Sequence, residues 1–116
     1  MKSIQGTKTE QNLLKAFAGE SQARNRYTLF AQKAKEEGYE QIMGIFAETA
    51  EQELAHATRF FKFMQGGMVS ITAEYPAGRI GNTAENLLEA AEGEKLEWSA
   101  LYNDFESVSY THLRAH

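Results

Sequence analysis

Apolar residues recur at steps of three or four through two long stretches of the chain, the first over about residues 9–37. One stripe of that stretch has a single carboxylate among its apolar positions: Leu13, Phe17, Glu20, Ala23, Tyr27, Phe30 and Ala34. This spacing is typical of one face of an α-helix. Thr7 and Glu10 have the spacing of a capping box, and Gly38 stands where a helix commonly ends. The pattern therefore predicts a helix between these two signals.

The second stretch predicts a helix over about residues 39–65, which Gly66 and Gly67 end. Its stripe again combines apolar and polar positions: Ile42, Ile45, Thr49, Glu53, His56, Phe60 and Phe63. The connection at Gly38 is short, so we expect the two helices to be antiparallel neighbours.

The segment "GGMVSITAEYPAGRIG" at 66–81 interrupts the helical pattern, because it is rich in glycine and contains the only proline of the chain. We expect a long crossover there. Asn82 and Glu85 then have cap-like spacing and begin a third helix. Its stripe is Leu87, Ala90, Glu94, Glu97, Leu101 and Phe105, and the pattern fades after Ser107.

An internal repeat connects the first and third helices. The segment "LLKAFAGE" (13–20) aligns with "LLEAAEGE" (87–94) at an offset of 74 residues. A copy of the second helix should then follow, with a second Glu-x-x-His at 127 and 130. These positions lie beyond residue 116, so we expect an all-α antiparallel bundle with three of its four long helices in this chain.

Composition narrows the class of protein. The 116 residues suit one domain, and the absence of cysteine excludes a disulfide framework or a thiolate metal site. A net charge of −4 argues against nucleic acid and anionic membranes as partners. The chain has no apolar N-terminal region and no run of about 18 apolar residues. We expect a cytoplasmic protein with no nucleic-acid or membrane partner.

Four glutamates and one histidine fall on the three predicted inward stripes: Glu20, Glu53, His56, Glu94 and Glu97. An unpaired buried carboxylate is very costly, and these stripes carry no lysine or arginine at matching positions. Two divalent cations would neutralise four carboxylates, and Glu53 and His56 are spaced to reach one ion. Oxygen ligands with one imidazole per metal suit iron, manganese or zinc. The pattern matches the ligand arrangement of di-iron carboxylate bundles.

Plainer interpretations stand beside this one. A lone Glu-x-x-His commonly lies on an exposed, salt-bridging face, and it is the agreement of three helices that favours a metal. Tyr27 and Tyr102 lie about two turns beyond Glu20 and Glu94. Each could be a core residue with a buried hydroxyl or a phenol hydrogen-bonded to a ligand carboxylate. His112 and His116 have i, i+4 spacing but no accompanying glutamate, so we do not assign them as ligands.

The segments "AFAGESQARNRY" (16–27), "IFAETAEQELAHATRFFKF" (45–63) and "AAEGEKLEW" (90–98) closely resemble the N-terminal part of rubrerythrins. The resemblance covers about residues 1–107 and implies a ferritin-like four-helix bundle that holds two irons. It also implies reduction of hydrogen peroxide to water in oxidative-stress defence. The positions that match family iron ligands are Glu20, Glu53, His56, Glu94 and Glu97. In that family, the positions of His56 and Glu97 are associated with redox-dependent movement of one iron. Tyr27 and Tyr102 match family tyrosines that lie near the ligands.

Two features of that family are not found in these 116 residues, namely the second Glu-x-x-His and the four-cysteine rubredoxin-like domain. We therefore expect a truncated sequence, a tail at 108–116 that does not resemble the family, and a separate electron donor such as a rubredoxin. An open apolar groove predicts a homodimer, with helices either swapped or packed face to face. A ferritin-like iron-binding or ferroxidase protein and a metal-free helical oligomerisation module remain the alternatives.

Overall fold

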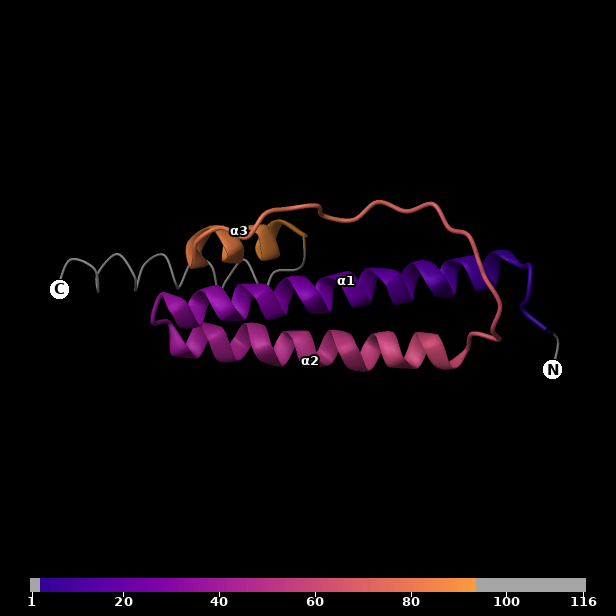
Figure 1. Cartoon of the computed structure of the whole chain (residues 1–116), viewed down its shortest axis with the longest axis horizontal. Coiled ribbons are helices and arrows are strands. Elements are labelled where there is room, and N and C mark those ends of the chain that lie inside the picture. Colours follow the sequence, from indigo (N-terminus) through magenta and orange to yellow (C-terminus); the bar gives the residue numbers. More distant parts are fainter. Residues whose placement is uncertain (1–2, 94–116) are drawn as a thin grey trace.

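The computed structural model describes residues 3–93, and these form three helices: α1 (Lys8–Glu36), α2 (Glu40–Lys62) and α3 (Thr83–Gly93). No strand occurs among the described residues, and the all-α fold predicted from the sequence is confirmed. Figure 1 shows α1 and α2 side by side, with the N-terminal end of α1 extending past α2 and with α3 on the other side of α1. Within the described part of the chain, no helix is long and apolar enough to cross a membrane.

The predicted signals at both ends of α1 are present. The Thr7 side chain accepts a hydrogen bond from the Glu10 backbone N–H at 3.2 Å and so caps the helix. The Glu10 carboxylate accepts from the Gly6 backbone N–H at 3.0 Å, one residue earlier than a standard capping box. At the other end Gly38 has a φ of 85°, which favours glycine, and reverses the chain into α2.

The crossover occupies residues 63–82 and returns along α1 to the end where α1 meets α2 (Figure 1). α3 then begins with a reciprocal capping box, in which Asn82 Oδ1 accepts from the Glu85 N–H at 2.8 Å and Glu85 Oε1 accepts from the Asn82 N–H at 3.0 Å. The crossover and the start of the third helix are as predicted. The rest of that predicted helix, from residue 94 on, lies outside the described residues.

The hydrophobic core lies at the end of the hairpin where α1 turns into α2. Tyr27, Phe30 and Phe46 are each no more than 2% exposed, with ring centroids 5.5–6.1 Å apart. Leu87 of α3 is fully buried in the same cluster. α3 therefore covers the aromatic core.

The inward face of α2 differs from the stripe predicted for it. Phe46, Ala50 and Ala57 are the buried residues of α2. The predicted stripe is instead half-buried at Ile42, Ile45, Thr49, Glu53 and Phe60, and exposed at His56 and Phe63. Glu53 lies beside the buried line of Phe46, Ala50 and Ala57, and His56 lies further round the helix toward solvent.

Candidate metal centre

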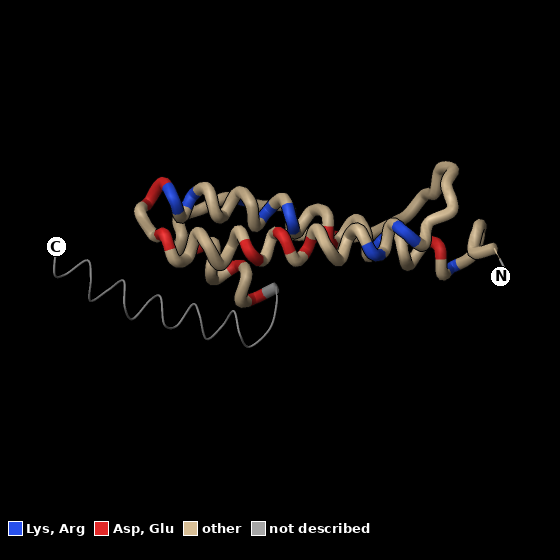
Figure 2. Tube along the Cα trace, turned by 90° about the horizontal axis from the view of Figure 1, so that it is seen from below, with Lys and Arg blue, Asp and Glu red and all other residues tan. Residues whose placement is uncertain are grey.

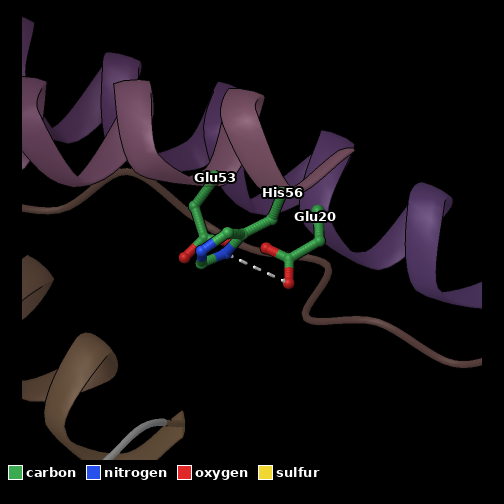
Figure 3. Close-up of side chains that lie close together, drawn as sticks. All are labelled: Glu20, Glu53 and His56. Carbon is green, nitrogen blue, oxygen red and sulfur yellow. Dashed lines mark ion pairs between the residues drawn. The ribbon is translucent and has the colours of Figure 1, made fainter. Parts of the chain in front are cut away.

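Two helices bring three of the predicted ligands together. Glu20 comes from α1, whereas Glu53 and His56 come from α2 and are three residues apart, so they project from the same face of that helix. Figure 3 shows the three side chains converging on one spot. One ligand atom of each lies within 4.8 Å of the other two.

The spacing of these atoms suits a metal ion. His56 Nδ1 and Glu20 Oε1 are 3.7 Å apart, which is too long for a hydrogen bond. Two ligand atoms bound to one ion at about 2.1 Å each can lie up to about 4.2 Å apart. The 3.7 Å pair fits that limit as it stands, and the third ligand needs at most a small side-chain rotation. Two carboxylates and an imidazole are ligands that iron, manganese and zinc accept.

The site is more open than the sequence predicts. The Glu20 side chain is 25% exposed and the His56 side chain 48% exposed, and Glu53 is half-buried. Figure 2 shows acidic positions of both long helices in the middle of the hairpin. Among the residues that the structure describes, no lysine or arginine lies within ion-pair distance of Glu20 or Glu53. Partial solvation therefore makes two carboxylates without a lysine or arginine partner tolerable until a cation neutralises them.

The three residues line a cavity of about 430 Å³. α1, α2, the crossover and α3 all contribute to its lining: Ala16, Gly19, Glu20, Gln22, Ala23, Arg26, Tyr27, Glu53, His56, Pro76, Glu89 and Ala90. Four elements therefore meet at one cavity.

Arg26 is a cavity residue that the sequence reasoning missed. Its Nε donates to Gln22 Oε1 at 2.7 Å, and its Nη1 lies 3.9 Å from Glu89 Oε1 on α3. The guanidinium is thus directed to α3 rather than to the candidate ligands. The i, i+4 spacing of Gln22 and Arg26 is the signal from which the hydrogen bond between them could have been predicted.

The other predicted site residues divide into two groups. Tyr27 is fully buried, packs against Phe30 and Phe46 as a core residue, and also lines the cavity; its bond to a ligand carboxylate stays a prediction. The predicted residues Glu94, Glu97 and Tyr102 lie outside the described residues, as do His112 and His116, which were not assigned as ligands.

Comparison with known proteins gives a consistent result. The sequence model of the rubrerythrin family matches residues 11–112. The chain is 67% identical over 108 residues to rubrerythrin of Porphyromonas gingivalis, an alignment that covers 93% of this chain and 54% of the relative. It is 57% identical over 114 residues to rubrerythrin-1 of Clostridium acetobutylicum, covering 94% and 58%.

A third relative, rubrerythrin of Nitratidesulfovibrio vulgaris, is 52% identical over 109 residues, covering 94% of this chain and 57% of the relative. The chain thus spans about half the length of the curated relatives it matches. Both the matched family and the metal-ligand geometry agree with the resemblance seen in the sequence. The chain belongs to the rubrerythrin family.

Proposed function

We propose that this chain forms the metal-binding part of a ferritin-like, non-haem di-iron peroxidase that reduces hydrogen peroxide to water in oxidative-stress defence. One observation supports the proposal above the others. Glu20, Glu53 and His56 come from two antiparallel helices of a rubrerythrin-family chain and place their ligand atoms within 4.8 Å of one another.

The proposed ligand set extends beyond this triad. Glu94 and Glu97 match family ligand positions, and with Glu20, Glu53 and His56 they would hold two irons, with manganese or zinc as substitutes. When bound, the iron pair supplies two electrons, which with two protons convert hydrogen peroxide to two waters. Tyr27 lines the same cavity, and its phenol would help to orient a ligand carboxylate. Tyr102 is proposed for the matching role.

Reduction of the centre requires an electron donor. These 116 residues contain no cysteine and so cannot hold a thiolate-ligated iron of their own. We propose a rubredoxin or a similar redox centre as the donor, and the cytoplasm as the compartment in which the two meet.

A peroxide assay of the iron-loaded chain tests the proposal. The reduced protein should be oxidised faster by hydrogen peroxide than by dioxygen, as followed by the absorbance of the ferric centre under anaerobic mixing. Sustained peroxide consumption with a chemical reductant should require bound iron. A chain that retains iron but consumes no peroxide would instead support the ferritin-like ferroxidase alternative.

We also propose that the chain self-associates. Leu54 and Phe61 of α2, and Phe63 directly after it, expose large apolar surface, with 42–64% of each residue accessible to solvent. Covering this surface with a second copy would remove it from water. Light scattering over a dilution series should show a dimer that dissociates on dilution, and a monomer at every concentration would refute this part of the proposal.

A further inference from the structure

The crossover is attached to α1 at a point next to the candidate metal centre. Tyr75 donates a hydrogen bond from its hydroxyl to the backbone carbonyl of Lys15 at 2.6 Å. Its ring lies against Gly19, one helical turn further along α1, where a Cβ on residue 19 would be only 3.2 Å from Tyr75 Cε1. A methyl group at residue 19 would therefore press against the ring, which would have to move by a few tenths of an ångström.

This attachment fixes one wall of the cavity. Pro76 follows Tyr75 directly and lines the cavity together with Gly19 and Glu20. Proline has a fixed φ and restricts the residue before it to extended conformations, so the chain at Tyr75 and Pro76 is locally stiff. In Figure 3 the crossover passes beside Glu20. The hydrogen bond of Tyr75 therefore also restrains Pro76, which lines the cavity.

The two sides of the cavity differ in their exposure to solvent. On the α1 side, where the crossover lies, the Glu20 side chain is 25% exposed. On the α2 side the His56 side chain is 48% exposed. The crossover contributes Pro76 to the cavity lining, and it attaches through Tyr75 to α1 rather than to α2. The less exposed of these two side chains is thus on the side to which the crossover is attached.

We propose that Tyr75 is a latch that holds the crossover on α1 as the closed wall of the cavity and leaves the α2 side, at His56, as the entrance. That metal ions and hydrogen peroxide are what enters there rests on the proposed function. The latch itself does not, because it consists of a hydrogen bond and a ring contact within the metal-free chain.

Cysteine labelling tests the latch directly, because the chain has no cysteine of its own. Ala16→Cys places a thiol in the cavity on the Gly19 face of α1, and His56→Cys places one at the proposed entrance. In the metal-free chain, iodoacetamide should modify the second thiol faster. Adding Tyr75→Phe, which removes the hydroxyl and keeps the ring, should accelerate labelling at residue 16 by roughly fivefold, the population shift expected from one lost hydrogen bond. Labelling at residue 56 should not change.

A double-mutant cycle tests the ring contact at Gly19. Gly19→Ala should also accelerate labelling of Ala16→Cys, because the new methyl group would press on the Tyr75 ring and weaken its attachment to α1. In a Tyr75→Ala background the same substitution should have no further effect on labelling, since the ring is already gone. It should then stabilise the chain slightly, because alanine favours a helix more than glycine does.

Two results would overturn the latch. One is an unchanged labelling rate at residue 16 in both Tyr75→Phe and Gly19→Ala. The other is equal acceleration at residues 16 and 56, which would mean general loosening of the fold. Failure of the chain to bind iron would refute the proposed function and leave these labelling results in force, because no metal is present in the assay.

Discussion

The turn end and the middle of the α1–α2 hairpin have opposite properties. At the turn end, Tyr27, Phe30 and Phe46 are at most 2% exposed, and α3 covers them. In the middle of the hairpin, Glu20 and His56 are 25% and 48% exposed at the side chain. Apolar burial stabilises the first region, whereas the second leaves two carboxylates partly solvated. Apolar burial at the turn end thus stabilises the fold. The middle of the hairpin can therefore carry carboxylates that add no stability.

The largest expected effect is in the aromatic core. Phe46→Ala should lower the free energy of unfolding by about 3–5 kcal/mol, because it leaves a cavity beside two other aromatic rings. Phe63→Ala removes the same group from a residue that is 64% exposed and should cost less than about 1 kcal/mol. Urea denaturation followed by circular dichroism measures both. Similar losses of unfolding free energy for the two variants would contradict the claim that the aromatic core at the turn end is what stabilises the hairpin.

A smaller effect is expected where α3 is attached to the hairpin. Glu37 Oε1 accepts from both the backbone N–H and the hydroxyl of Thr83, each at 2.6 Å, and so caps α3 from the α1–α2 turn. Glu37→Ala should destabilise the chain by about 1–2 kcal/mol. The neighbouring Glu36→Ala loses only an exposed ion pair with Lys33, 3.7 Å away, and should be close to neutral in the same urea titration. Equal effects would show that the contact with Thr83 does not hold α3.

The smallest effect on stability is expected at the site itself. In the metal-free chain, Glu53→Ala should change the free energy of unfolding by no more than about 0.5 kcal/mol and leave helicity intact. The half-buried carboxylate has no lysine or arginine partner among the described residues, so its removal breaks no favourable ion pair. Thermal unfolding by circular dichroism with a chelator present provides the measurement. A loss of several kcal/mol would mean that Glu53 has a structural role.

Local signals were sufficient to predict the hairpin and part of the site. Thr7 and Gly38 mark the ends of α1 through cap chemistry, which depends only on nearby backbone. The three-residue spacing of Glu53 and His56 determines that they share a helix face, and Glu20 lies on a stripe of the neighbouring helix. The convergence of these three residues therefore follows from periodicity and a short connection.

Features that depend on contacts between distant segments could not be predicted in the same way. Periodicity shows that α2 has apolar residues over a wide arc but not which of them pack on α1, so the predicted stripe left out the buried positions Phe46 and Ala50. The contact of Tyr75 with Lys15 joins residues 60 positions apart, and that of Glu37 with Thr83 joins residues 46 apart. Neither leaves a periodic pattern in the sequence.

Iron binding by the reduced chain and two matched variants tests the central claim most directly. Anaerobic titration with ferrous iron should show binding to the unchanged chain. Glu53→Ala, which removes a proposed ligand, should weaken that binding by at least about 100-fold, since even residues that only support a ligand contribute about 10–100-fold. Glu48→Ala removes an exposed glutamate of the same helix and should bind as the unchanged chain does. Equal affinities for all three proteins would contradict the assignment of Glu20, Glu53 and His56 as a metal centre.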